Sequence, residues 1–325
     1  MISIKLTSGL ANTLFQYASV RTFAEKRGYR FCYFVTRRTF KYRVKSFKSY
    51  IGQKLGRSEK RLEPPFMKDD ISSYFILSGE SFLRRSFLKI WWSLKPENKK
   101  NYFSPKREKL EDENSSGNYE TFDEDMQLAN DWTEFSGSFQ ADSYFSDNRD
   151  KIIQWFTLKK KYSTQLESIV SSLSHPIEMR CCIHVRRGDY LTQGKGLSGG
   201  QEGWALPIEY YESALKIIPD DLLFLITTDS PDYVEKHFSF IKNKIIFIDN
   251  PDAVDLHLFT QCKYNIIANS SFSWWGAWLN NYPNRFIVAP KYHLGWALQT
   301  WIPWSFSNHP KDWTYIDILS IIKKK

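Results

Sequence analysis

Two adjacent arginines and a nearby carboxylate stand where a hydrophobic run ends. The heptapeptide His184–Tyr190 (HVRRGDY) directly follows Cys181-Cys182-Ile183, a run that predicts a buried strand. In sheets of parallel strands, ligands bind at the carboxyl ends of the strands. A guanidinium is planar, permanently charged and carries five donors, which suits the oxygens of a phosphate. The heptapeptide therefore predicts a site for an anionic ligand, such as a phosphate or a pyrophosphate.

The same residues allow two other interpretations. Arg186 and Arg187 can form solvated surface ion pairs, as exposed charges usually do. Arg187-Gly188-Asp189 also matches a tripeptide used in adhesion, although three residues after a buried strand are a weak signal. Motifs elsewhere in the chain distinguish between these interpretations.

Four segments resemble, in the same order, motifs of the α-1,2-fucosyltransferase family, glycosyltransferase family 11. His184–Tyr190 is similar to the His-x-Arg-Arg-x-Asp signature of GDP-fucose-dependent fucosyltransferases. Gly9–Ala18 resembles Gly-Leu-Gly-Asn-Gln-Met-Phe-Gln-Tyr-Ala, and Gly137–Phe145 resembles a Gly-Tyr-Phe-Gln…Tyr-Phe segment. Asn269–Leu279 (NSSFSWWGAWL) matches the third family motif almost letter for letter. The matches run from about residue 2 to about residue 290.

The resemblance implies an α/β fold of the GT-B type, in which two Rossmann-like domains face each other across a cleft. We expect residues 1–150 to form an acceptor-side domain and residues 151–325 to form a GDP-fucose-binding domain. Alternating strands and helices support parallel sheets. In the first domain we expect strands at Ile2–Leu6 and Tyr29–Val35 around a helix over Thr13–Arg27 that stops at Gly28. In the second we expect strands at Cys181–Val185, Leu222–Thr227, Lys244–Ile248, Tyr264–Ala268 and Arg285–Ala289, and a helix over Pro207–Ile218 with Pro at its first position.

The activity that the resemblance implies is transfer of L-fucose from GDP-β-L-fucose to the 2-hydroxyl of a terminal β-galactoside, inverting to an α-1,2 linkage. The expected partners are GDP-fucose and a β-galactoside-terminated oligosaccharide or lipid-linked glycan. The family is metal-independent, so no cofactor and no metal are expected. Asp123-Glu124-Asp125 has an Asp-x-Asp pattern, but no strand precedes it and we expect a loop.

Within the signature, Arg187 is expected to hold the β-phosphate of the donor as preorganised charge, with Arg186 beside it. On an ideal strand His184 shares a face with Arg186, and it is either a donor-binding or a structural residue. Asp189 would orient an arginine, hold a ligand hydroxyl or act as the general base. Asp229 follows a predicted strand, where guanosine contacts would fall, and it is equally suited to cap a helix.

The third motif follows a predicted strand and looks like the start of a helix. Its serines are N-cap candidates, and free N–H groups at a helix N-terminus bind phosphate. The alternative is capping together with packing of Trp275 and Trp278. The donor-binding candidates here are Asn269, Ser270, Ser271 and Ser273.

On the acceptor side the candidates are Gly9, Asn12 and Gln16. Gly9–Asn12 is expected to be a loop, in which Asn12 positions the acceptor hydroxyl or the fucose, or else caps the following helix. Ala11 stands where the family has glycine, and alanine restricts conformations with positive φ. This departure leaves open a fucosyltransferase of other linkage or acceptor; a non-catalytic carbohydrate-binding relative is the other alternative, which both arginines argue against.

Composition bounds the remaining classes. A chain of 325 residues exceeds the usual size of one core, which favours two domains. Its four cysteines show no metal or disulfide spacing, as in a reducing compartment. No signal peptide or apolar run of membrane-spanning length is visible. Because animal members carry an N-terminal anchor, the chain resembles a bacterial cytoplasmic enzyme.

The net charge of +9 is concentrated in Arg37–Arg61, where Glu59 is the one acidic residue. Such a run is usually a solvated face, but basic residues also bind anionic lipid headgroups. Arg84–Trp92 is a second cationic segment with amphipathic character. Both allow peripheral contact with the inner face of a membrane. Nucleic acid is not expected as a partner, since no recognition module is visible.

Overall fold

The computed structural model describes residues 1–35, 71–78, 81–109, 118–120, 122–194, 203–294, 302–303 and 310–322. The chain divides into two compact units. The first comprises Met1–Glu108 and Glu120–Lys159, and the second comprises Lys109–Tyr119 and Lys160–Lys325. The predicted boundary near residue 150 falls within the first unit. The reason is a pair of backbone hydrogen bonds, from Ile76 N to Thr157 O at 2.9 Å and from Leu77 N to Trp155 O at 2.9 Å.

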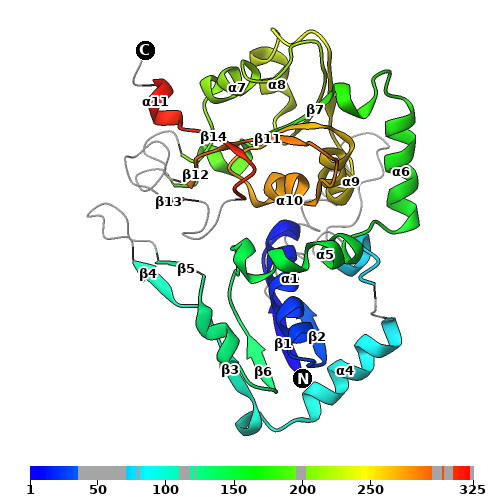
Figure 1. The fold of residues 1–325 in the computed structure, drawn as a ribbon, viewed down its shortest axis with the longest axis vertical. Helices are drawn as coiled ribbons and strands as arrows, with labels where there is room; N and C mark the ends of the chain where they lie inside the picture. Colours follow the sequence, from blue (N-terminus) through cyan, green and yellow to red (C-terminus); the bar gives the residue numbers. More distant parts are fainter. Residues whose placement is uncertain are drawn as a thin grey trace, which may run out of the picture. The chain divides into compact units, whose positions relative to one another are not determined.

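The first unit is built on a parallel four-stranded sheet in the order β2-β1-β6-β3. Its strands and α-helices, drawn in Figure 1, are β1 (Ile2–Leu6), α1 (Leu10–Lys26), β2 (Phe31–Val35), α3 (Ile71–Tyr74), α4 (Phe82–Leu94), β3 (Asn101–Phe103), β6 (Thr133–Phe135) and α5 (Arg149–Trp155). Short 3-10 helices are η1 (Glu97–Lys99), η2 (Glu124–Leu128), η3 (Asp142–Tyr144) and η4 (Ser146–Asn148). A separate pair of strands is formed by β4 (Arg107–Lys109) and β5 (Asn118–Glu120). The chain passes from the first unit to the second within β4 and returns within β5.

Helix α1 ends as the sequence predicts. Gly28 has φ +66°, the left-handed conformation that glycine adopts without a steric penalty. Its N–H donates to Glu25 O at 3.1 Å, and the N–H of Tyr29 donates to Ala24 O at 2.8 Å. This pair of bonds is a Schellman motif, which satisfies carbonyls that the helix end would leave without partners. The start of the helix differs from the prediction, because α1 begins at Leu10 rather than at Thr13.

The second unit contains a six-stranded sheet, parallel throughout, in the order β14-β11-β10-β7-β8-β9. The strands are β7 (Arg180–Val185), β8 (Leu223–Thr228), β9 (Lys244–Phe247), β10 (Tyr264–Ile266), β11 (Phe286–Pro290) and β14 (Thr314–Ile316). All five predicted strands are confirmed, with ends shifted by no more than two residues. A two-stranded antiparallel pair joins β12 (Tyr292–Leu294) and β13 (Ile302–Pro303).

Helices cover both faces of this sheet, with α7 and α8 on one face and α9 and α10 on the other (Figure 1). The α-helices are α6 (Lys160–Ser171), α7 (Ile208–Leu215), α8 (Pro231–His237), α9 (Asp252–Leu258), α10 (Ser271–Leu279) and α11 (Ile318–Ile322). The 3-10 helices are η5 (Ile177–Met179), η6 (Gly188–Leu191) and η7 (Phe259–Gln261). Pro207 has extended ψ of 159° and is the N-cap of α7, so its predicted place at the first helical position was wrong by one residue.

The strand order of the second unit fixes where a ligand would bind. The chain enters the sheet at β7, runs outward through β8 and β9, and then returns to the other side of β7 with β10, β11 and β14. This is the doubly wound arrangement of dinucleotide-binding domains. Its direction reverses between β7 and β10, and the crevice beyond the carboxyl ends of those two strands is the usual ligand site. Both units are thus α/β with parallel sheets, as expected of a GT-B-type chain.

Candidate functional site

The two most diagnostic motifs of the sequence emerge at this reversal point. His184–Tyr190 covers the end of β7 and the turn beyond it, while Asn269–Leu279 follows β10 and forms α10. Strands β7 and β10 are direct neighbours, with Ile183 level with Ile266. The ring of His184 packs on the ring of Phe272, 5.3 Å between centroids. Motifs about 85 residues apart in sequence therefore meet at one end of the sheet, as the prediction of a strand-end site requires.

The guanidinium of Arg186 is already neutralised by the protein. Its Nη1 donates to Asp229 Oδ2 at 2.7 Å, and its Nη2 forms an ion pair with Asp189 Oδ1. The side chain also lies 5.1 Å from the ring centroid of Tyr190. Because β7 ends at Val185, Arg186 does not continue the strand face of His184 as an ideal strand would have it. Arg186 is thus an organising residue between two loops.

Arg187 differs from its neighbour in having no counter-ion among the described residues. Its guanidinium carbon lies 3.6 Å from the ring centroid of Tyr233, a cation–π contact that fixes the side chain without neutralising it. Its backbone N–H donates to Asp229 Oδ1 at 3.0 Å. A partly exposed guanidinium held in place with its donors available is suited to an anionic ligand.

Asp229, which follows β8, is the residue that positions both arginines. One carboxylate oxygen accepts from Arg186, and the other accepts from the backbone of Arg187 and from Ser230 Oγ at 3.1 Å. Gly188 permits this approach, since a Cβ there would lie 2.6 Å from Asp229 Oδ2. The helix-cap alternative is wrong, because Ser230 is the N-cap of α8 and that helix has no side-chain cap. The expected guanosine contact of Asp229 stays a prediction.

Asp189 lies on η6 and its carboxylate has two protein partners. Oδ1 pairs with Arg186, and Oδ2 accepts from Gln193 Nε2 at 3.0 Å. A carboxylate in this position can orient Arg186 as it stands. To act as a general base it would have to exchange one of these partners for the reacting hydroxyl.

His184 is a neutral imidazole. Burial, and next the nearby charge of Arg186, lower its pKa to about 3, and only the charge of Asp229 opposes them. The side chain is buried, and Nδ1 has no hydrogen-bond partner among the residues that the structure describes. On the neighbouring strand the register partner Thr227 is also buried, and its Oγ1 has no partner in the described part of the chain. Buried polar atoms are nearly always satisfied, so unpartnered ones at a strand end are suited to a ligand.

The N-terminus of α10 confirms one predicted cap and corrects a second prediction. Ser270 is the N-cap, and its Oγ accepts from the N–H of Phe272 at 3.3 Å. Ser273 is fully buried, and its hydroxyl donates within the turn to Ala268 O and Ser270 O, both at 3.2 Å. Its hydroxyl is therefore used by the fold and does not face a ligand. Ser271, in the first turn, is partly exposed.

Asn269 links the third motif to a segment that the sequence analysis did not single out. Its Nδ2 donates to Trp204 O at 2.8 Å, while its buried Oδ1 has no partner within the described ranges. The N–H of Trp204 in turn donates to Tyr190 O at 2.8 Å, and the two rings meet edge to face. Burial raises the pKa of Tyr190 to about 12, and its hydroxyl hydrogen-bonds Ser270. Tyr190 was visible in the heptapeptide, whereas nothing in the sequence marked Trp204 or Tyr233.

In the first unit the two remaining motifs also meet. The amide of Gln140 donates to Asn12 Oδ1 at 2.8 Å, and Gln16 Nε2 donates to Gly137 O at 2.8 Å. Gln16 also holds Thr7, accepting from its N–H and donating to its hydroxyl, both at 2.9 Å. Gln16 is buried and fully engaged, so the structure gives it a scaffold role. The acceptor roles of Gly9 and Asn12 stay predictions.

The predicted loop over Gly9–Asn12 was wrong in most of its length. Gly9 is the N-cap of α1, and residues 10–12 form the first helical turn. Ala11 is therefore helical and buried, a setting that alanine favours and that needs no positive φ. The alanine in place of the family's glycine does not perturb this turn. The positive φ lies instead at Ser8, at +73°.

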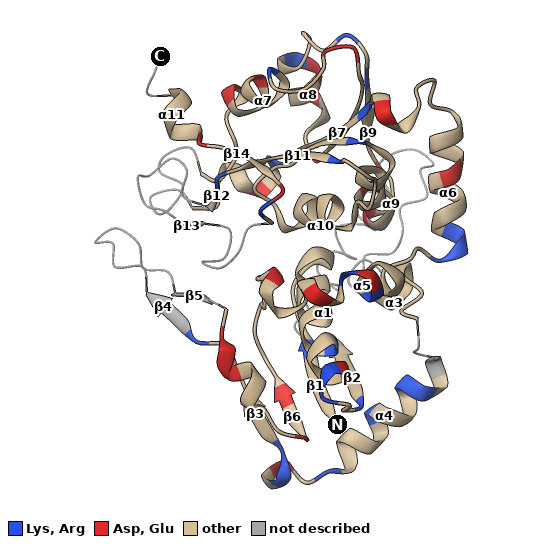
Figure 2. Ribbon diagram, viewed as in Figure 1, with Lys and Arg blue, Asp and Glu red and all other residues tan. Residues whose placement is uncertain are grey.

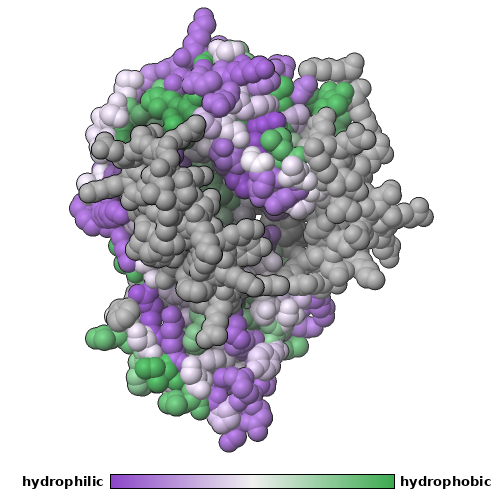
Figure 3. All heavy atoms as spheres, turned by 180° about the vertical axis from the view of Figure 1, so that it is seen from behind, coloured by the Kyte–Doolittle hydropathy of each residue, from purple (hydrophilic) through white to green (hydrophobic). Residues whose placement is uncertain are grey.

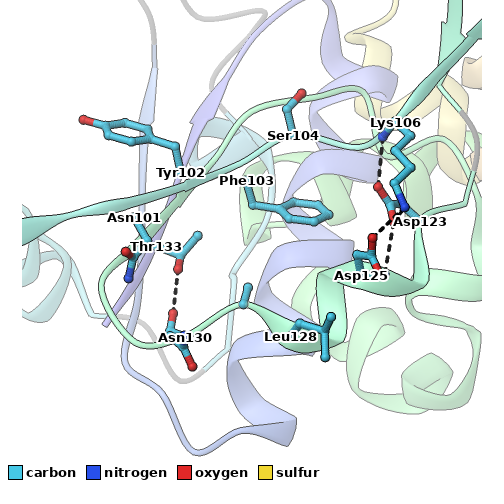
Figure 4. Close-up of a pocket in the computed structure, with 11 residues that line it drawn as sticks. Asn101, Tyr102, Phe103, Ser104, Lys106, Asp123, Asp125, Leu128, Asn130 and Thr133 are labelled. Atoms are coloured by element: carbon cyan, nitrogen blue, oxygen red, sulfur yellow. Dashed lines mark hydrogen bonds and ion pairs between the residues drawn. The ribbon is translucent and has the colours of Figure 1, made fainter.

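The Asp-x-Asp triplet borders an open pocket of about 460 Å³ in the first unit (Figure 4). It forms the start of η2 rather than a loop, with Asp123 as the N-cap accepting from the N–H of Asp125 at 3.0 Å. Asp123 also accepts from the N–H of Lys106 at 2.9 Å, and Lys106 Nζ pairs with Asp125 at 2.5 Å. In the described part of the chain no group of three or more metal-ligating side chains is present. The expected metal independence stays a prediction.

Of the two segments predicted to contact a membrane, the structure describes one. The basic run Arg37–Arg61 lies outside the described residues. Across the described ranges no helix combines the length and the apolar character needed to cross a bilayer. The amphipathic segment around Arg84–Trp92 is confirmed as helix α4.

Comparison with known proteins agrees with these motifs. The family described as Glycosyl transferase family 11 matches residues 1–317. An O-antigen biosynthesis glycosyltransferase, WbnK of Escherichia coli, is 30% identical over 179 residues, which cover 51% of this chain and 56% of that protein. An alpha-1,2-colitosyltransferase of Escherichia coli is 31% identical over 202 residues, covering 57% and 62%. The chain thus spans less than two thirds of either relative.

Among solved structures, POFUT1 in complex with GDP-fucose is similar, with a TM-score of 0.51 and 10% identity. The alignment covers 89% of this chain and 97% of that one. At this identity the likeness concerns the fold alone.

Proposed function

Since the chain belongs to glycosyl transferase family 11, we propose that it transfers L-fucose from GDP-β-L-fucose to the 2-hydroxyl of a terminal β-galactoside. The product would carry an inverted, α-1,2 linkage. The observation that carries the proposal is Arg187, a guanidinium without a counter-ion among the described residues, at the reversal point of a nucleotide-binding sheet. The four motifs supply the sugar and the linkage by resemblance.

Charge development at the leaving group explains why an arginine matters. As the bond between fucose C1 and the β-phosphate oxygen breaks, GDP gains negative charge and the sugar gains oxocarbenium character. Arg187 would stabilise the phosphate oxygens, and its cation–π contact means that little reorganisation is needed. Asp229 holds Arg186 and the backbone of Arg187 in place, and it shares the charge of Arg186 with Asp189. No metal is needed for this step of the proposal.

The buried polar atoms at the strand ends would complete the donor site. Three buried atoms have no partner among the residues described, namely Nδ1 of His184, Oγ1 of Thr227 and Oδ1 of Asn269. Hydroxyl and phosphate groups of the donor are natural partners for them. His184 would act as a neutral hydrogen-bonding group and not as an acid, because its pKa of about 3 leaves it uncharged at physiological pH. As the acceptor oxygen attacks C1 and the bond from C1 to the β-phosphate oxygen breaks, the hydroxyl proton passes to Asp189 or to solvent water. A dissociative transition state needs little help from this base.

The acceptor is the open half of the proposal. A β-galactoside-terminated oligosaccharide or lipid-linked glycan fits the family, and O-antigen assembly is the setting that one relative's name suggests. The relative named as an alpha-1,2-colitosyltransferase supports a second candidate, transfer of colitose by the same site. Colitose is fucose without the 3-hydroxyl, so the two donors differ by one hydrogen-bonding group. A site that binds that hydroxyl should reject colitose strongly.

The experiment is transfer from GDP-fucose or GDP-colitose to a panel of β-galactosides, with EDTA or with Mn²⁺, followed by linkage analysis. We expect an α-1,2-fucosyl product in EDTA, with a higher kcat/KM for GDP-fucose. Arg187→Ala should lower kcat by about 10²–10³. Arg285→Ala is the matched control, because Arg285 pairs with Asp312 at the amino end of β11, whereas Arg187 follows the carboxyl end of β7.

Two results would contradict this proposal. A folded wild-type protein that transfers neither sugar to any galactoside would remove the proposed function. Full activity of Arg187→Ala would leave the function standing and remove the role of that guanidinium.

A further inference from the structure

Helix α4 of the first unit exposes a continuous apolar face. Its large hydrophobic side chains Leu83, Phe87, Ile90 and Leu94 are 78%, 62%, 61% and 74% exposed. Their spacing of four, three and four residues places them on one side of a helix. Single exposed leucines need no explanation, but four on one helical face form a patch, and patches of this kind mark interaction sites.

Among the described residues of the unit, this face does not pack on the core. The opposite side of α4 does that work, where Leu88 and Trp92 are buried against Met1 and Cys32. Trp92 also stacks on Trp132 with 5.7 Å between ring centroids. The helix is therefore held in place by one face and presents the other outward. In Figure 3, green residues gather at the lower left, the side on which α4 lies once Figure 1 is turned.

The charged residues of helix α4 itself are all basic. Helix α4 contains no acidic residue, and Figure 2 shows its charged positions in blue only. On a helical projection Arg84 flanks the apolar stripe. Lys95 follows at the end of the helix, with its ammonium 4.5 Å from the ring centroid of Trp132 on the packed side. Arg30 lies over the half-buried ring of Trp91, 4.5 Å from its centroid. Apolar residues bordered by cations and a tryptophan are the pattern of helices that lie in a membrane interface.

We propose that α4 docks the protein onto an anionic lipid bilayer, lying in the plane of the interface with its apolar face among the acyl chains. Thirteen residues extend about 20 Å, which is too short to cross a hydrocarbon core of about 30 Å. Charge complementarity selects an anionic bilayer over a second copy of the chain. A two-fold contact between copies would bring identical cationic surroundings together. The inference does not depend on the proposed reaction.

The test is flotation of the full-length protein with vesicles of phosphatidylcholine alone or mixed with phosphatidylglycerol. We expect binding to the anionic vesicles that weakens with salt and little binding to the neutral ones. The double variant Leu83→Asp/Leu94→Asp should bind at least about tenfold more weakly. Leu128→Asp is the matched control, because Leu128 is also 74% exposed but lies on η2. It should bind as the wild type does.

Sedimentation of the same proteins separates the other occupants. The aspartates are introduced at exposed positions, so both variants should keep the wild-type thermal transition. Equal vesicle binding by the double variant and the wild type would overturn the proposal. A wild-type dimer that the double variant dissociates, without vesicle binding by either, would overturn it in favour of self-association.

Discussion

Replacing Asp255 with asparagine should change how the stability of the second unit depends on pH. Burial raises the pKa of this α9 carboxyl from 3.8 to about 7, although Asn250 donates to it at 2.9 Å. A folded-state pKa above the unfolded value means that the folded state keeps a proton which the unfolded state has lost. Asp255 therefore lowers stability as pH rises from about 4 to 7.

His184 has the opposite effect over nearly the same range. Its folded-state pKa of about 3 lies below the unfolded value of 6.5. Between these two pH values the unfolded state binds a proton that the folded state does not bind. Stability from this group is complete above pH 6.5 and is lost as pH falls toward 3. Between pH 5 and pH 7 each group contributes a change of about 2 kcal/mol, in opposite directions. In the wild type the two changes nearly cancel.

The variants Asp255→Asn and His184→Gln should reveal the pH dependence that each group contributes to the unfolding free energy. Relative to wild type, the unfolding free energy of Asp255→Asn should rise by about 2 kcal/mol from pH 5 to pH 7, and that of His184→Gln should fall by about as much. Urea unfolding at three pH values measures this, with tryptophan fluorescence as the signal because Trp274, Trp275 and Trp278 are buried in the second unit. Curves for both variants that run parallel to wild type would refute the reasoning, whatever their absolute offsets.

Three further substitutions test the geometry of the second unit. Gly188→Ala should displace the carboxylate of Asp229, lowering kcat with little change in thermal stability, as steady-state kinetics and melting would show. Gly276→Ala should destabilise the unit by about 1–3 kcal/mol in denaturant unfolding, because the new Cβ would lie 2.6 Å from Phe259. Ser270→Ala should cost about 1 kcal/mol in the same assay through loss of the α10 cap, and a neutral result would contradict that role.

Features that depend on neighbouring residues could be predicted from the sequence. The glycine stop of α1, the cap at Ser270 and the strands of the second sheet follow from propensities and periodicity within a few residues. The start of α1 could not be predicted in this way, because its N-cap Gly9 makes no side-chain capping hydrogen bond. Without a side-chain capping signal, the sequence predicts a helix start at Thr13, three residues after the observed start at Leu10.

Partners distant in the chain could not be predicted. The pairing of Asp229 with Arg186 joins residues 43 positions apart, and Gln16 reaches Gly137 across 121. Nothing in a carboxylate or an amide says which backbone it will meet once the sheet has formed. The motifs located the site, but the assignment of each side chain to ligand or scaffold needed the three-dimensional contacts.

The hydrogen bonds between the segments Gly9–Ala18 and Gly137–Phe145 have a consequence for engineering. Two hydrogen bonds connect these segments, one between Asn12 and Gln140 and one between Gln16 and Gly137. The two segments therefore form one structural unit. A replacement at residue 12 alone would strand the amide of its partner, so the effects of changes at the two positions should be epistatic. Libraries aimed at new acceptors should therefore vary residues 12 and 140 jointly, and transplants from a related enzyme should carry both segments as a cassette.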